Sequence, residues 1–245
     1  MQWQDHGMIV SMTPYGDTRS ILSVFTRNHG ICNAMIRLNK KKQSLQIGDR
    51  VCVTWRARLA NNLGYFNSCE IISSAFYAYF QDHSKLLCLS SVTSTIYKSV
   101  PTNDAHPILY DYLIEFAEAA ECGGHWYNEY LKLELEILSQ LGFALDLSRC
   151  AVYHCEDNLL YISPKTGRAI SERAGISYRH LLFPLPQILR DLHNGTHTEQ
   201  CSRKEFLLCL QILGYFLHRH LLSDDSKFLE QRKEMTALIY EEEAF

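Results

Sequence analysis

The spacing of apolar residues changes once along this chain, close to Phe80. Before Phe80, apolar and polar residues alternate in short segments separated by turn residues, a pattern typical of half-buried β-strands. After Phe80, apolar residues recur every three or four positions, which is the spacing of amphipathic helices. A chain with one such change is expected to fold as a β domain followed by a helical domain, in the α+β class. The expected domains are residues 1–80 and 81–245.

The first domain is expected to contain five short strands with no helix between them. The expected strands are Gly7–Thr13, Ser20–Arg27, Ile31–Leu38, Val51–Arg58 and Tyr65–Ala75. The turn sequences Pro14-Tyr15-Gly16-Asp17 and Asn28-His29-Gly30 separate the first three strands. Five strands in so short a stretch suit a small closed barrel of the oligonucleotide-binding (OB) type. A small β-sandwich would give much the same pattern and is the alternative architecture.

The second domain is expected to be mainly helical. The expected helices are Asp82–Val100, Pro107–Glu121, His125–Leu141, Pro186–Leu192 and Cys201–Leu222. Asp82 is a suitable N-cap for the first of these, and Pro101 ends it. Residues 158–170 predict a small β-hairpin. The acidic tail from Ser223 is expected to fray.

Charge is distributed unevenly between the two expected domains. The formal net charge is −3, but residues 1–80 contain nine Lys and Arg against four Asp and Glu. Residues 81–245 contain 15 basic and 23 acidic residues. A basic first third joined to an acidic remainder suggests that polyanion binding is concentrated at the front of the chain. The remainder is expected to be a scaffold or a protein-binding part.

Three consecutive lysines follow the third expected strand. An isolated run of this kind is more often a solvated loop than a binding site. Here, however, arginines from several strands and loops belong to the same small domain, and together they could line a groove that follows a phosphodiester backbone. The candidate nucleic-acid-binding residues are Arg19, Arg27, Arg37, Lys40, Lys41, Lys42, Arg56, Arg58 and Tyr65.

Tyr65 is included because an exposed aromatic ring can stack on nucleic-acid bases. It is followed by Phe66, and strand alternation places one ring of this pair inside the barrel and the other outside. Tyr15, in the first turn, could stack in the same way. Surfaces that combine positive charge with aromatic rings bind nucleic acid with little sequence preference.

The sequence contains few signals of catalysis or metal binding. It has no Gly-rich phosphate loop, no Gly-x-Ser-x-Gly and no His-Glu-x-x-His. Cys150, His154 and Cys155 supply three metal ligands in six positions, but a structural zinc site needs four, and only His180 follows nearby. We therefore expect structural thiols, no metal and no cofactor. A cysteine-dependent enzyme that uses Cys150 or Cys155 with His154 is an alternative.

The compartment is expected to be the cytoplasm. The nine cysteines are odd in number and form no disulfide framework, and the first residues lack the features of a signal peptide. No apolar run approaches the roughly 20 residues that a membrane helix needs.

Several short motifs resemble one known family when they are taken together. They are Tyr15-Gly16-Asp17, Thr26-Arg27 with Gly30, the basic segment from Arg37 to Ser44, Leu138-x-x-Leu141-Gly142-Phe143-x-Leu145-Asp146-Leu147-x-x-Cys150, and Tyr161-Ile162-Ser163-Pro164-Lys165-Thr166-Gly167-Arg168-Ala169. Their order and spacing resemble the RecO DNA repair and recombination mediator proteins over nearly the whole chain.

The resemblance implies an N-terminal OB-fold barrel, a helical domain and a role without catalysis. Proteins of this kind bind single- and double-stranded DNA, anneal complementary strands, and work with RecR to load the RecA recombinase onto DNA coated by single-strand-binding protein. Many members carry a four-cysteine zinc finger. Cys150 matches its first position, but Cys155 is displaced and the second pair is absent. Residues of about 146–182 are therefore expected to form a degenerate, metal-free version of that insertion.

One alternative uses the same barrel for another ligand. A general RNA-associated or ribosome-associated OB-fold protein would show the same basic and aromatic residues, because single-stranded RNA is also bound by charge and stacking.

Overall fold

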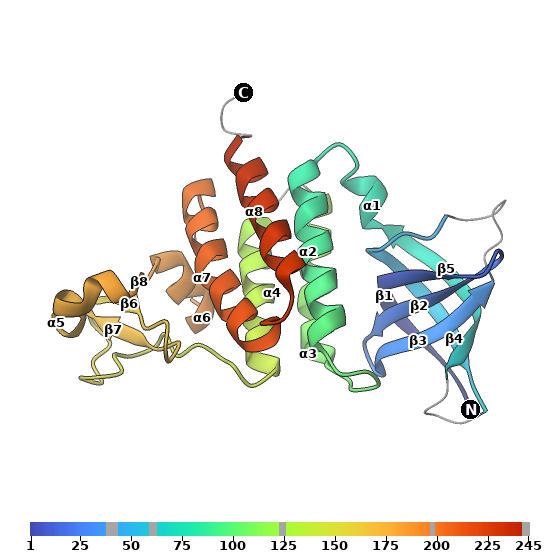
Figure 1. The fold of residues 1–245 in the computed structure, drawn as a ribbon, viewed down its shortest axis with the longest axis horizontal. Coiled ribbons are helices and arrows are strands. Elements are labelled where there is room, and N and C mark those ends of the chain that lie inside the picture. The colour runs from blue at the N-terminus through green and yellow to red at the C-terminus, as the bar shows by residue number, and fades with distance from the viewer. Residues whose placement is uncertain (38–43, 59–62, 123–125, 197–198, 242–245) are drawn as a thin grey trace. The chain divides into compact units, whose positions relative to one another are not determined.

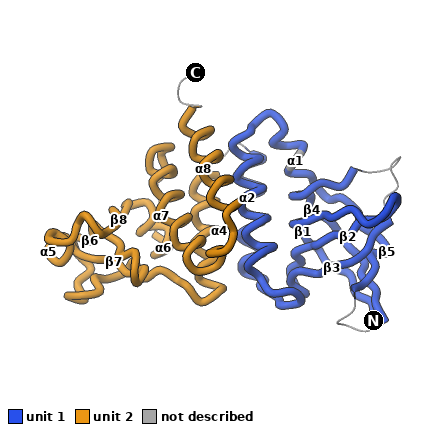
Figure 2. Tube along the Cα trace, viewed as in Figure 1, with its two compact units in different colours: residues 1–122 blue, residues 123–245 orange. Residues whose placement is uncertain are grey.

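The computed structural model describes residues 1–37, 44–58, 63–122, 126–196 and 199–241. The chain divides into two compact units, Met1–Cys122 and Gly123–Phe245 (Figure 2). The first unit contains the expected barrel and also the helices that follow it in the chain, up to Cys122. No helix in the described ranges is both long enough and apolar enough to cross a membrane.

The strands of the first unit form a closed five-stranded barrel, which confirms the α+β class and the barrel rather than the sandwich. They are β1 (Gln2–Tyr15), β2 (Arg19–Thr26), β3 (Gly30–Arg37), β4 (Asp49–Arg56) and β5 (Gly64–Ser74). Their order around the barrel is β1-β2-β3-β5-β4. Only the β3–β5 pair is parallel among the strand pairs within the described barrel. Each predicted strand overlaps one of these.

Alternation along the strands builds the barrel core, as the sequence pattern predicts. Leu22, Val24, Val51 and Val53 are fully buried and pack in one cluster. Trp55 joins this cluster beside Gly64, where a Cβ atom would lie only 2.1 Å from the indole nitrogen. A side chain at position 64 therefore cannot be accommodated, and β5 has to begin with glycine.

Three helices complete the first unit: α1 (Ala75–Ala78), α2 (His83–Ser99) and α3 (Pro107–Glu121). The predicted N-cap is confirmed, because the Asp82 side chain accepts a hydrogen bond from the Lys85 backbone N–H at 3.1 Å. In Figure 1, α2 and α3 stand on one side of the barrel and β3 ends on the opposite side.

Close packing fixes α3 to the barrel where β2 ends and β3 begins. The rings of Phe25 and Tyr110 meet edge to face with centroids 6.0 Å apart. Gly30 has φ +67°, and a Cβ atom there would lie 2.0 Å from the Asp104 carbonyl oxygen. Only glycine tolerates both the left-handed conformation and this approach, so the β2–β3 turn can lie directly against the residues that precede α3.

The second unit combines helices with a small sheet. Its helices are α4 (Trp126–Gln140), α5 (Glu172–Gly175), η1 (Ile176–Leu181), α6 (Gln187–Asn194), α7 (Arg203–Leu221) and α8 (Ser226–Glu241). Its strands are β6 (Leu159–Ile162), β7 (Ala169–Ser171) and β8 (Phe183–Pro184), in the order β7-β6-β8. The predicted hairpin is present and gains a third strand.

The expectation that the tail frays from Ser223 is wrong, because α8 is an ordered helix with a buried face. Phe228, Met235 and Ile239 are at most 3% exposed. Arg232 lies among them and forms a buried ion pair with Glu134 of α4, and it donates to the Leu210 carbonyl of α7 at 2.6 Å. The acidic residues of this segment occupy the outer face of an amphipathic helix, and their charge concealed its periodicity.

Candidate nucleic-acid interface

Strand register brings most of the predicted site residues to one end of the barrel. On neighbouring strands, Arg19 lies opposite both Tyr15 and Arg37. Tyr65 lies opposite Arg56 on β4 and opposite Met35, which is two residues before Arg37 on β3. Paired residues on adjacent strands project to the same face of a sheet, so these side chains share the outer surface. We call this surface, defined by Tyr15, Arg19, Arg37, Arg56, Arg58 and Tyr65, the open end.

The arginines of the open end are exposed and carry uncompensated charge. Among the described acidic residues, none lies within ion-pairing distance of Arg19, Arg37, Arg56 or Arg58. Arg19 and Arg37 are directly opposite each other, and like charges in such a cross-strand pair repel. A bound polyanion would relieve that repulsion, which makes this pair a suitable phosphate contact.

A hollow of about 610 Å³ lies beside Tyr65 at the open end. Arg56, Arg58 and Asn67 also line it. The side chain of Tyr65 is 50% exposed, whereas that of Phe66 is 5% exposed and belongs to the core. Of the two alternatives for this pair, the structure therefore selects Tyr65 as the outward ring. An exposed ring flanked by guanidinium groups suits base stacking together with phosphate binding.

The three lysines of the predicted site lie outside the described residues. The chain leaves the described part after Arg37, which belongs to the open end, and Lys40, Lys41 and Lys42 follow. Their contribution stays a prediction. Asn61 and Asn62, between β4 and β5 in the chain, also fall outside the described ranges.

Arg27 is the one described member of the predicted arginine set that does not reach the open end. It follows the last residue of β2, whereas Arg19 is the first, so the eight-residue strand separates them by about 26 Å. Its Nε and Nη2 atoms donate to the two carboxylate oxygens of Asp111 on α3, each at 2.8 Å. These hydrogen bonds raise the pKa of Arg27 and lower that of Asp111.

Arg50, which the sequence pattern did not single out, has the same kind of environment. It lies near the start of β4, and its Nη1 atom is 2.6 Å from a carboxylate oxygen of Glu118 on α3. Asp111 and Glu118 therefore each hold one barrel arginine. We call the region defined by Arg27, Arg50, Asp111 and Glu118 the α3 end. No sequence signal marks these pairs, because the partners are separated by 84 and 68 positions.

The expected zinc-finger-like region contains a buried thiol rather than a fitting zinc site. Cys150 Sγ accepts hydrogen bonds from the backbone N–H groups of Ser171 at 3.3 Å and Val152 at 3.5 Å. Burial raises the pKa of this thiol, but hydrogen bonds from Ser171 and from the backbone outweigh burial and lower the pKa to about 7. The Cys155 thiol points to the Asp157 carbonyl, and no cluster of three potential metal ligands occurs within the described residues.

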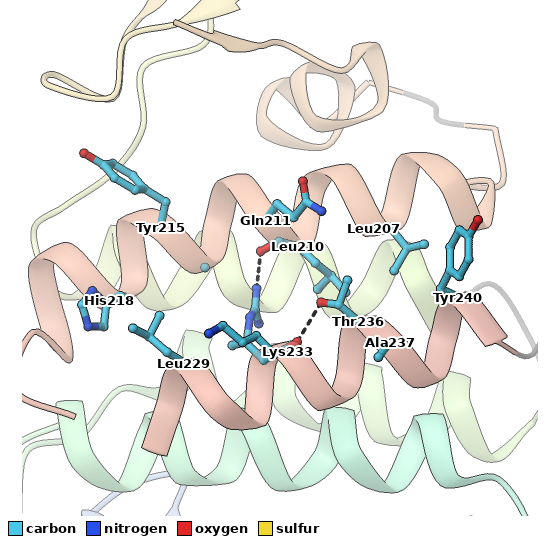
Figure 3. Close-up of a pocket in the computed structure, with 12 residues that line it drawn as sticks. Leu207, Leu210, Gln211, Tyr215, His218, Leu229, Lys233, Thr236, Ala237 and Tyr240 are labelled. Carbon is cyan, nitrogen blue, oxygen red and sulfur yellow. Dashed lines mark hydrogen bonds between the residues drawn. The ribbon is translucent and has the colours of Figure 1, made fainter. Parts of the chain in front are cut away.

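A second hollow lies between α7 and α8 in the second unit (Figure 3). It has a volume of about 680 Å³, and Leu207, Leu229 and Ala237 form much of its apolar wall. Lys233 and Arg232 also line this groove. The Arg232 guanidinium donates hydrogen bonds to the Glu134 carboxylate and to the Leu210 carbonyl. The sequence did not predict this groove, because no helix was expected after Ser223.

Two family models match this sequence. One, described as "Recombination protein O N terminal", matches residues 1–75, and the other, "Recombination protein O C terminal", matches residues 81–227. The DNA repair protein RecO of Anaplasma marginale (strain Florida) is 55% identical over 239 residues, covering 98% of this chain and 100% of that protein. The same-named protein of Ehrlichia chaffeensis is 42% identical over 242 residues, covering 98% of each chain. That of Rickettsia typhi is 30% identical over 241 residues, covering 98% of this chain and 99% of its own.

Proposed function

Because the chain belongs to the RecO family of DNA repair proteins, we propose that it is a recombination mediator that binds single- and double-stranded DNA at the open end of its barrel. It anneals complementary strands and, with RecR, helps to load RecA onto DNA coated by single-strand-binding protein. It does this in the cytoplasm, without catalysis and without a cofactor. The observation that supports the proposal most strongly is the set of exposed arginines at the open end, which have no carboxylate partner among the described residues.

Annealing requires two polyanionic strands to approach each other. Guanidinium groups that contact phosphates release condensed counterions and reduce the repulsion between the strands. Three of the arginines at the open end come from different strands, and Arg58 follows β4 in the chain. Spread in this way, they can contact several successive phosphates of a DNA strand rather than a single one. Tyr65 adds stacking on an unpaired base, which favours single strands without selecting a sequence.

The second unit is assigned to protein partners in this proposal. Residues 123–245 contain 17 acidic and 13 basic residues, and this acidic excess disfavours a nucleic-acid contact there. RecR and single-strand-binding protein are the expected partners, and RecA is reached indirectly through them.

The test is fluorescence-monitored annealing of complementary oligonucleotides, with and without single-strand-binding protein. We expect the wild-type protein to accelerate annealing, and the double variant Arg19→Ala with Arg37→Ala to lose most of that acceleration. Arg149 and Arg179, which are exposed in the second unit, provide a matched control that removes the same number of charges. The control variant should anneal like the wild type. Equal losses in both variants, or no acceleration by the wild type, would contradict the proposal.

Competition separates this function from the RNA-associated alternative. Unlabelled single-stranded DNA should displace labelled DNA at lower concentration than structured RNA of equal length does. Preferential displacement by the RNA would instead favour a contact to the 2′-hydroxyl groups and a role on RNA.

A further inference from the structure

Helix α3 presents a row of carboxylates at the α3 end. Asp111, Glu115 and Glu118 are four and three residues apart, so they lie on one face of the helix. Asp111 and Glu115 line a hollow of about 400 Å³ together with Arg27 and Arg50. Two of the three carboxylates hold a barrel arginine at hydrogen-bonding distance. The row therefore faces basic groups of the kind that the open end offers to DNA.

The charge density of this row resembles that of a nucleic-acid strand. Asp111 and Glu118 are seven residues apart, which corresponds to about 10 Å of helix axis. Three carboxylates thus span a length over which one strand of B-DNA carries about four phosphates, since its phosphates are spaced by about 3.4 Å along the axis. Arg27 binds Asp111 through two parallel N–H groups, which is also how arginine binds a phosphate.

The α3 end would be accessible to DNA if these carboxylates were absent. The side chains of Asp111 and Glu118 are 45% and 57% exposed, so the arginines behind them are near solvent. The side chains of Arg27 and Arg50 are themselves 48% and 27% exposed, so neither arginine is sealed inside the barrel. Exposed ion pairs such as these are weak and are screened by salt. Their carboxylates can still compete with phosphates, because the fold holds them next to the arginines.

We propose that Asp111 and Glu118 are specificity-determining residues that occupy Arg27 and Arg50 in place of phosphates and so confine DNA to the open end. This inference rests on the proposed function, since it concerns where on the barrel DNA binds. It removes Arg27 from the set of DNA contacts that the sequence predicts. It also gives α3 a role besides packing against the barrel, as an internal competitor for nucleic acid.

The test is the salt dependence of binding to single-stranded DNA for the double variant Asp111→Asn with Glu118→Gln. Releasing two arginines should steepen the slope of log affinity against log salt by about 1.4, at about 0.7 for each additional phosphate that an arginine binds. Adding Arg27→Ala and Arg50→Ala to this variant should return the slope to the wild-type value. Thermal unfolding of each variant shows whether its fold is retained.

The matched control neutralises Glu70 of β5 and Glu121 of α3, two exposed carboxylates that lie outside this row and hold no arginine among the described residues. The variant Glu70→Gln with Glu121→Gln changes the net charge equally and should leave the slope unchanged. Equal slopes in the two double variants would overturn the inference. If the wild-type protein binds DNA, that result leaves the proposed function intact; absence of wild-type binding would contradict both.

A measurement on the wild-type protein makes the inference independent of the stability of the variants. Arginine modification by phenylglyoxal can be mapped by mass spectrometry with and without DNA. We expect DNA to slow modification of Arg19 and Arg37 and to leave the rates at Arg27 and Arg50 unchanged. Equal protection of all four arginines would overturn the assignment.

Discussion

The two ends of the barrel carry the same type of side chain in different surroundings. At the open end, Arg19 and Arg37 face each other and are exposed, with no acidic partner within the described ranges. At the α3 end, Arg27 and Arg50 are each paired with a carboxylate of α3. Arg19 is the first residue of β2, and Arg27 directly follows the last residue of the same strand. The difference teaches that a count of basic residues measures the charge of a domain but does not locate its binding surface.

The largest expected effect is on DNA affinity, and it should follow from removing the arginine pair of the open end but not that of the α3 end. The variant Arg19→Ala with Arg37→Ala should bind single-stranded DNA about 100-fold more weakly and lower the salt slope by about 1.4, because two phosphate contacts are lost. The variant Arg27→Ala with Arg50→Ala should keep the wild-type slope. Fluorescence anisotropy titrations over a series of salt concentrations measure both quantities. The comparison between the two ends would fail if both pairs changed the slope equally.

A smaller effect is expected at Tyr65, and it sharpens the description of the open end. Replacing Tyr65 by Ala should weaken binding to single-stranded DNA about tenfold, since stacking on one base contributes about 1–3 kcal/mol. The salt slope should stay at the wild-type value, because no cation is lost. Tyr65→Phe, which keeps the ring, is the matched control and should bind like the wild type. A change in slope without a change in affinity at low salt would argue against stacking.

The smallest effect concerns the pH dependence of stability at Asp5, which lines the hollow at the α3 end. Burial raises the pKa of Asp5, but hydrogen bonds from His29, Asn28 and the His6 backbone outweigh burial and hold the pKa below its ordinary value of 3.8. A carboxyl group with a lowered pKa in the folded state stabilises the protein above its unfolded pKa. This contribution should therefore be lost as the pH falls below about 3.8.

Urea unfolding measured between neutral pH and pH 3 tests the expectation for Asp5. The variant Asp5→Asn should be less stable than the wild type at neutral pH, and its stability should fall less steeply in acid. Parallel curves for the two proteins would show that Asp5 does not contribute to the acid dependence.

Much of the fold could be predicted from local patterns. Alternation located all five strands of the barrel, since the side-chain period of two is a property of each strand alone. Asp82 and Pro107 marked the starts of α2 and α3 for similarly local reasons, a side-chain cap and a ring suited to the first turn. The segment after Ser223 is the exception, because its acidic residues suggest fraying, whereas its apolar residues form the buried face of α8. Arg232 of α8 pairs with Glu134 of α4, and these two residues are 98 positions apart in the chain, so no local pattern could reveal the contact.

The sequence by itself determined that this protein has a basic β-barrel ahead of an acidic helical part, because strand period, helix period and charge are all local properties of the chain. It also determined that one ring of the Tyr65–Phe66 pair is outward. Only the tertiary structure decided which arginines remain available. Asp111 and Glu118 lie far from Arg27 and Arg50 in the chain, and an ion pair depends on distance in space, which barrel closure and the packing of α3 establish together.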